Sequence, residues 1–230
     1  MIFVIAIFFM IVSYAVGARL KSKFKKYSQV PLQSNLSGAE IAKLMLADNN
    51  IHDVEVTCVA GQLTDHYNPG NKTVNLSETV YHGRSAASAA VASHECGHAV
   101  QHATAYGMLE LRSAMVPIQN VSGKVINFIF IAMIFGGAFL FQAFPYNTVI
   151  LVIIGAYAVM TSFAFITLPV EFDASKRALA WIEQRNIVNS NEHGMAKDAL
   201  KWAAMTYVVA AIGSLVTLLY YVSILLGRSD

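Results

Sequence analysis

Long apolar runs alternate with polar stretches along this chain, and the alternation predicts an integral membrane protein. Apolar residues dominate segments 2–16, 125–143, 149–168 and 206–226. A helix needs about 20 apolar residues to cross a bilayer, so each run fits one transmembrane helix, the first being slightly short. We therefore predict an α-helical membrane protein with about four transmembrane helices.

The polar stretch after the first run has the pattern of a small α+β domain. Ser37 and Glu40 have the spacing of a capping box and precede a short amphipathic helix. Apolar and polar residues then alternate, and an Asn-Pro-Gly turn separates two further short segments. Strands are therefore predicted at 54–58, 63–67 and 73–76.

Two helices are predicted in the remainder of this polar stretch. An alanine-rich segment at 84–92 begins a helix that should continue to about Ala105. A second, short helix is expected over 109–115. It should end at Pro117, because a proline inside a helix removes a backbone hydrogen bond and clashes with the preceding turn.

Composition and charge support a membrane protein with a defined orientation. Only 13% of the residues are charged, against about 25% in soluble domains, and the mean hydropathy is +0.50. The net charge of +2 gives no indication of a nucleic-acid partner. Basic residues follow the first apolar run, whereas a cleavable signal peptide carries its charge before the run. Their distribution predicts that both termini lie outside and that the polar regions are cytoplasmic.

These patterns predict five consecutive segments. They are a transmembrane helix at 1–18, a cytosolic region at 19–123, a transmembrane hairpin at 124–168, a cytosolic segment at 169–205 and a fourth transmembrane helix at 206–227.

The first cytosolic region carries an H-E-x-x-H motif, formed by His94, Glu95 and His98. On a helix the two histidines lie one turn apart on the same face, where two neutral imidazoles can bind one Zn²⁺ ion. Glu95 can then accept a proton from a water in the open coordination position. Gly97 lowers the stability of such a helix. Its presence is better explained by another element that approaches the helix closely at this position.

The two cysteines, Cys58 and Cys96, have the spacing of neither a redox motif nor a disulfide framework. Cys96 lies within the H-E-x-x-H motif, two residues from each histidine, so on a helix it points away from their shared face. We interpret Cys96 as a small packing residue.

A catalytic zinc site needs a third protein ligand. The metzincin pattern is absent because Thr104 occupies the place of its third histidine. His102 lies about 12 Å along the helix axis from His94, so it should support the site indirectly or lie on the soluble face. Glu171 and Asp173 follow the third apolar run. They point about 200° apart on a helix, so only one can face the metal, and Glu171 is the better placed. Asp173 would then hold a ligand histidine or cap a neighbouring helix.

Four segments together resemble the YugP-type bacterial membrane zinc metallopeptidases and, more remotely, the HtpX-type gluzincin proteases. The segments are LTDHY at 63–67, VNLS at 74–77, SHECGHAVQH at 93–102 and PVEFDA at 169–174. The resemblance covers nearly the whole chain. It implies an endopeptidase with one catalytic Zn²⁺ ion, with His94, His98 and Glu171 as ligands and Glu95 as general base.

The resemblance also implies a location and a substrate class. It places the protein in the bacterial cytoplasmic membrane, where it would cleave proteins or peptides of the membrane or its surroundings. The distribution of basic residues predicts that the active site faces the cytoplasm. One position departs from the HtpX-type pattern, in which an Asp commonly follows the Glu ligand by four residues. Ser175 occupies that position here.

A peptidase also needs a donor for the oxyanion of its transition state, and the candidates are His66, Tyr67, Tyr106 and Arg177. The sequence favours a structural role for each of them. For His66 and Tyr67 this role is packing at a strand end, for Tyr106 it is interfacial anchoring, and for Arg177 it is a solvated helix face or contact with lipid headgroups.

Two rival functions need consideration. An intramembrane protease would carry the motif inside a spanning helix, but three histidines and a glutamate make this helix too polar to face lipid. A zinc-binding adaptor that does not cleave its partner would use the same ligands and stays open. Glu95 favours the peptidase, since an adaptor needs no base beside the metal.

Overall fold

A computed structural model describes residues 1–227, apart from the side chains of residues 137–140. The chain forms two compact units. The first, the apolar unit, comprises Met1–Ser13, Leu111–Leu168 and the chain from Tyr207 onward. The second, the polar unit, comprises Tyr14–Glu110 and Pro169–Thr206.

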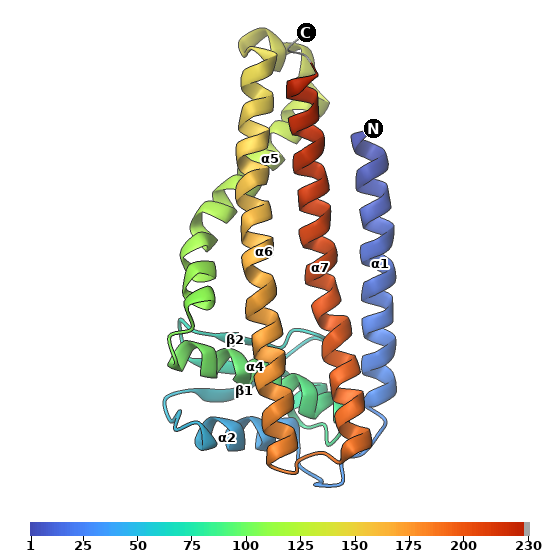
Figure 1. Ribbon diagram of the computed structural model, residues 1–230, viewed down its shortest axis with the longest axis vertical. Coiled ribbons are helices and arrows are strands. Elements are labelled where there is room, and N and C mark those ends of the chain that lie inside the picture. The colour runs from blue at the N-terminus through green and yellow to red at the C-terminus, as the bar shows by residue number, and fades with distance from the viewer. Residues whose placement is uncertain (228–230) are drawn as a thin grey trace. The chain divides into compact units, whose positions relative to one another are not determined.

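The described residues form seven helices and three strands, which carry the labels of Figure 1. They are α1 (Ile2–Tyr27), α2 (Gly38–Asp48), β1 (Glu55–Val59), β2 (His66–Asn68), β3 (Thr73–Ser77), α3 (Glu78–Tyr81), α4 (Ala86–Ala103), α5 (Gly107–Ala143), α6 (Tyr146–Gln184) and α7 (Ser190–Leu226).

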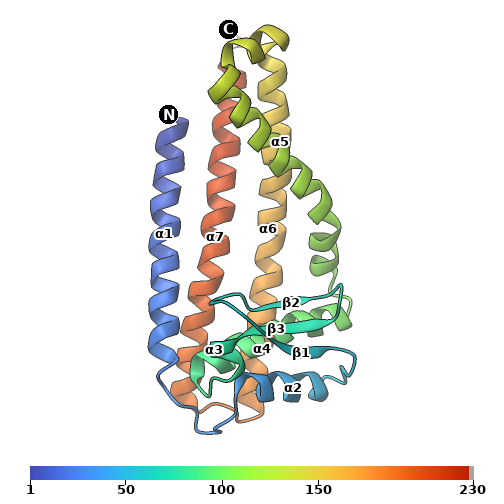
Figure 2. The ribbon, with the colours of Figure 1, turned by 180° about the vertical axis from the view of Figure 1, so that it is seen from behind.

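The polar unit contains a three-stranded sheet with the strand order β1-β3-β2 (Figure 2). Strand β1 is parallel to β3, and β2 is antiparallel to it, so that Val74 lies between Val56 and Tyr67. Every residue of the central strand β3 is buried. The strands agree with the predicted segments in order and, within a few residues, in position. Strand β2 forms one edge of the sheet and contacts helix α4.

Helices α2 and α4 pack against each other in the same core. Ser37 caps α2 in the predicted way, because its hydroxyl accepts from the Glu40 amide while the Glu40 carboxylate accepts from the Ser37 amide. Ile41 and Met45 of α2 are fully buried in a core that also includes Leu76 and Ile182. The core therefore joins segments of the polar unit that are far apart in the sequence.

The apolar unit consists of helical segments that expose many large apolar side chains, among them Phe8, Phe128 and Phe135. Surfaces of this kind are characteristic of chains that contact lipid. Four helices, α1, α5, α6 and α7, are long and apolar enough to cross a membrane. This agrees with the predicted number of transmembrane helices.

The structure corrects the prediction that a short helix ends at Pro117. Helix α5 continues through Pro117, and α6 continues in the same way through Pro169. A proline removes one hydrogen bond from a helix, but a long helix keeps the bonds on either side and is bent more often than ended. The departure from helical geometry within α5 instead occurs at Gly136, where φ is −146°.

Candidate metal centre

Helix α4 of the polar unit carries the whole H-E-x-x-H motif. Its N-terminus is capped by the Ser85 hydroxyl, which accepts from the Ser88 amide. The spacing places His94 and His98 on one face, with their ring centroids 4.8 Å apart and their planes nearly perpendicular. Both side chains are largely buried, at 13% and 11% exposure. Two imidazoles are thus held side by side in a protected position.

Gly97 allows helix α6 to approach α4 closely. A Cβ atom at this position would lie 2.6 Å from the Ala174 carbonyl oxygen, which is closer than van der Waals contact permits. Ala174 is fully buried and lies one turn after Glu171. The glycine therefore explains how the Glu171 segment reaches the histidines, as the sequence predicted for an approaching element.

The Glu171 carboxylate completes a group of three candidate ligands. Its Oε2 atom lies 3.3 Å from His94 Nε2 and 3.6 Å from His98 Nε2. One ligand atom from each residue falls within 4.8 Å of the other two, and within residues 1–227 no other three His, Cys, Asp or Glu side chains come together in this way. Ligands about 2.0–2.1 Å from a tetrahedral Zn²⁺ lie about 3.3–3.4 Å apart, so the residues fit such an ion.

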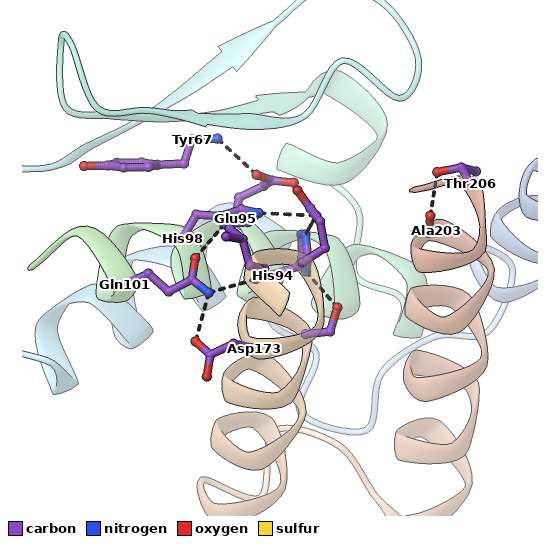
Figure 3. Close-up of polar contacts among 11 residues, drawn as sticks. Tyr67, His94, Glu95, His98, Gln101, Asp173, Ala203 and Thr206 are labelled. Carbon is purple, nitrogen blue, oxygen red and sulfur yellow. Dashed lines mark hydrogen bonds and ion pairs between the residues drawn. The ribbon is translucent and has the colours of Figure 1, made fainter. Parts of the chain in front are cut away.

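Gln101 fixes the orientation of His98 (Figure 3). Its Nε2 atom donates to the Val170 carbonyl and to the Asp173 carboxylate, each at 2.8 Å. The amide oxygen is thereby left to accept from His98 Nδ1, at 3.0 Å. A neutral His98 with its proton on Nδ1 keeps the Nε2 lone pair available for a metal, which is the tautomer that a metal ligand needs.

His94 is oriented by a residue of helix α6, whereas the partner of His98 belongs to α4. The Ser175 hydroxyl lies 3.1 Å from His94 Nδ1. Ser175 lies one turn after Glu171 on α6, so both side chains reach the histidine pair from the same helix. A hydroxyl can accept from Nδ1 and so favour the same tautomer in His94.

Glu95 lies between the histidines and the edge of the sheet. It is 8% exposed, and its Oε2 atom accepts from the backbone N–H of Tyr67 in β2 at 3.0 Å (Figure 3). This bond holds the carboxylate beside the candidate ligands. Glu95 therefore lies next to the three candidate ligands, but it is not one of them; the carboxylate in that group belongs to Glu171.

Electrostatics at the centre favour positive charge. Burial of His98 lowers its pKa, but the hydrogen bond with Glu171 and the negative charges of Glu95 and Glu171 outweigh burial, so the pKa of His98 is raised. The same carboxylates would stabilise a bound divalent cation.

The other residues singled out in the sequence have separate contacts. Asp173 accepts from Gln101 and from Arg177 Nε, the latter at 2.6 Å, so its carboxylate is held away from the ligand group. The guanidinium of Arg177 lies over the ring of Tyr106. The Tyr67 hydroxyl is 2.8 Å from His102 Nδ1.

Two further predictions concern His66 and Cys96. His66 Nδ1 lies 2.8 Å from the carbonyl oxygen of Thr64, two residues earlier in the loop that leads into β2. Cys96 is fully buried, its thiol donates to the Ala42 carbonyl, and burial raises the pKa of that thiol. Cys96 therefore packs in the core as predicted, whereas His66 is exposed and its ring makes polar contacts at the start of β2.

Sequence reasoning missed Gln101. The residue is fully buried, and an amide carries no motif for metal binding. The available signal was its position three residues after His98, which places both on one face of the helix.

Comparisons with known proteins agree with this geometry. The family model described as "Putative neutral zinc metallopeptidase" matches residues 2–226. The "Putative membrane protease YugP" of Bacillus subtilis (strain 168) is 43% identical over 212 residues, which cover 92% of this chain and 91% of that protein. No solved structure matches the chain. The extent of both matches shows that the chain belongs to this neutral zinc metallopeptidase family.

Proposed function

We propose that the protein is a membrane-embedded zinc endopeptidase in which His94, His98 and Glu171 bind one catalytic Zn²⁺ ion. The observation that carries the proposal is the convergence of three ligand atoms within 4.8 Å of one another in a largely buried position. Family membership supports zinc as the metal. The supporting contacts of Gln101 and Ser175 suit imidazoles that present Nε2 to a metal.

Glu95 is the general base in this proposal. A bound zinc ion would polarise the substrate carbonyl and lower the pKa of a coordinated water to about 7. Glu95 accepts the proton of the attacking water and later transfers it to the leaving amine. The Tyr67 amide orients the Glu95 carboxylate for both transfers, because it donates to Oε2.

Replacement of Glu95 by Gln tests the proposal. The purified protein in detergent is compared with E95Q for bound zinc and for cleavage of an unfolded protein substrate. The variant should retain zinc and lose activity by about 10²–10⁴-fold, the typical contribution of a general base. E78Q, which changes an exposed glutamate of α3, is the matched control and should keep both properties.

Two results would contradict the assignment. Loss of zinc in E95Q would make Glu95 a ligand, and undiminished cleavage would remove it from the reaction. An E95Q protein that retains its cellular role without proteolysis would instead favour the zinc-binding adaptor.

We further propose a bacterial cytoplasmic-membrane location with both termini outside and the metal centre in the cytoplasm. The distribution of basic residues beside the four apolar helices supports this orientation. The natural residue Cys58 allows this orientation to be tested by thiol labelling. Cys58 is exposed in the polar unit, whereas Cys96 is buried. An impermeant thiol reagent should label Cys58 in lysed cells and leave it unlabelled in intact cells.

Two variants make the labelling experiment decisive. Cys58→Ser should remove the signal from lysed cells, which assigns it to that residue. Asn147→Cys, made in the Cys58→Ser background, places a thiol in the exposed first turn of α6, between the second and third apolar runs, and should be labelled in intact cells. Labelling of Cys58 in intact cells would reverse the proposed topology.

A further inference from the structure

Helices α6 and α7 line an open groove in the polar unit, and none of the candidate metal ligands is among its lining residues. It is lined by residues between Phe172 and Glu183 of α6 and between His193 and Met205 of α7, and its volume is about 470 Å³. This lies within the range of about 300–1,000 Å³ that is common for small-molecule sites.

Positive charge is concentrated on one part of this groove. Lys176, Lys197 and Lys201 line it, all three are exposed, and in the described part of the chain none of them forms an ion pair. Among the lining residues that the structure describes, Glu183 is the acidic one, and its carboxylate lies 3.8 Å from His193 Nε2. Neither of these side chains pairs with a lysine, and with His193 neutral the three lysines and Glu183 give the lining a formal charge of +2.

One more acid stands next to this cluster and is already engaged. Asp198 follows Lys197 on α7, and its carboxylate pairs with Lys23 of α1 at 2.6 Å and accepts from the Tyr27 hydroxyl. It lies outside the groove lining. Burial raises the pKa of Asp198, but these two contacts and the positive charge of Lys201 lower it. This carboxylate therefore lies within electrostatic range of the groove, but its ion pair with Lys23 offsets its charge.

Apart from Ser175, the remainder of the lining is apolar. Leu200 and Ala204 of α7 are nearly buried, at 4% and 8% exposure, and Leu179 of α6 faces the same space. A small inorganic anion would gain nothing from this surface. A ligand with both an anionic group and a hydrocarbon chain would contact all of it.

The order of residues along the helices separates the charged and apolar parts. With a rise of 1.5 Å per residue, Lys176 lies about 12 Å from the loop end of α6, and Lys197 and Lys201 lie about 10 and 17 Å from that of α7. Phe172 and Met205 lie farther from the loop. Beyond them each helix continues into its long apolar run.

We propose that this groove binds an anionic phospholipid. The phosphate lies among Lys176, Lys197 and Lys201, and an acyl chain extends along Ala204 and Met205 towards the apolar runs. Basic pockets at the cytoplasmic ends of membrane helices are suited to anionic headgroups, whereas a zwitterionic headgroup brings a cation to a site that already holds three. The proposal does not depend on peptidase activity.

Lipid retention by the full-length protein tests this proposal. The detergent-solubilised chain is titrated with dioleoyl phosphatidylglycerol, dioleoyl phosphatidylcholine or inorganic phosphate, and bound ligand is counted by native mass spectrometry. We expect one phosphatidylglycerol per chain at low lipid concentration, no retained phosphatidylcholine, and phosphate binding only at far higher concentration.

Two variants identify the groove as the site. The triple variant K176Q/K197Q/K201Q should raise the half-saturating phosphatidylglycerol concentration by roughly 100-fold, since each lysine contributes about fivefold. The triple variant K21Q/K25Q/K26Q removes the same charge from exposed positions of α1 and is the matched control. It should change binding by less than about threefold, because isolated surface charges are screened by salt.

A third variant tests shape separately from charge. Ala180 lines the groove and is exposed, so Ala180→Trp should fill the space without harming the fold, and phosphatidylglycerol retention should be lost. Circular dichroism and zinc content verify that each variant is folded.

Three outcomes would overturn the proposal. Equal losses in the two lysine variants would indicate a diffuse surface attraction, and full retention in Ala180→Trp would place the lipid elsewhere. Phosphate that binds as tightly as phosphatidylglycerol would show that the site takes a free anion.

Discussion

The two sides of the candidate metal centre are held in different ways. On one side, His98 Nδ1 contacts Gln101, a fully buried amide whose two other hydrogen bonds are made to Val170 and Asp173. On the other side, the described residues give His94 Nδ1 one hydrogen-bond partner, the hydroxyl of Ser175, which can rotate and can either donate or accept.

This difference separates a rigid imidazole from an adjustable one. The Gln101 amide has a single orientation that satisfies its partners, and a salt-bridged chain from Asp173 to Arg177 supports it. The Ser175 hydroxyl imposes no comparable restriction on His94. Preorganisation of a ligand raises metal affinity, so the His98 side should contribute more to zinc binding than the His94 side.

Removal of Glu171 should have the largest effect, since its carboxylate lies against both histidines. We expect Glu171→Ala to abolish stoichiometric zinc binding by the detergent-solubilised protein, measured by metal analysis after gel filtration. Asp173→Ala should weaken zinc by only about tenfold, because it acts through Gln101. The reverse order of metal loss in folded protein would assign the ligand role to Asp173.

Replacement of Gln101 should have the next largest effect on zinc binding. It removes the support of His98 and leaves the contact between Ser175 and His94 in place. Gln101→Leu keeps the size of the side chain but leaves His98 Nδ1, the Val170 carbonyl and the Asp173 carboxylate without their shared partner. Zinc affinity should fall by up to about 100-fold, the upper range for residues that support a ligand. Competition with a chromophoric chelator measures the affinity.

A matched change elsewhere in the polar unit controls for general damage to the fold. Gln33 contacts Glu192 through its backbone amide, so Gln33→Leu preserves this bond and leaves the metal centre untouched. It should bind zinc as the unmodified protein does. Equal affinities in Gln101→Leu and Gln33→Leu would remove Gln101 from the support of His98.

The parts of this arrangement that rest on local spacing could be predicted from the sequence. The histidine pair follows from helix periodicity, and the Ser37–Glu40 capping box follows from a three-residue interval that the structure reproduces. Glu171 was selected because it follows an apolar run, and the structure brings it to the histidines. Gly97 indicated a close approach, although not the identity of the approaching helix.

The parts that rest on distant contacts could not be predicted in this way. Gln101 acquires its role from Val170 and Asp173, which lie about 70 positions away in the sequence and become neighbours only when α6 packs on α4. Pro117 was given too much weight, because the local cost of a proline does not reveal whether the surrounding helix can tolerate it.

Replacement of Ser175 should have the smallest effect and tests the adjustable side. Ser175→Ala removes one hydrogen bond to His94 Nδ1, and a single neutral hydrogen bond contributes about 0.5–1.5 kcal/mol, or about a two- to tenfold change in zinc affinity. His94 remains largely buried beside His98 and Glu171, so its packing should preserve the orientation of the ring. Ser93→Ala is the matched control, because the Ser93 hydroxyl donates only within α4. A loss in Ser175→Ala as large as that in Gln101→Leu would mean that both imidazoles are held equally firmly, and the contrast between the two sides would not hold.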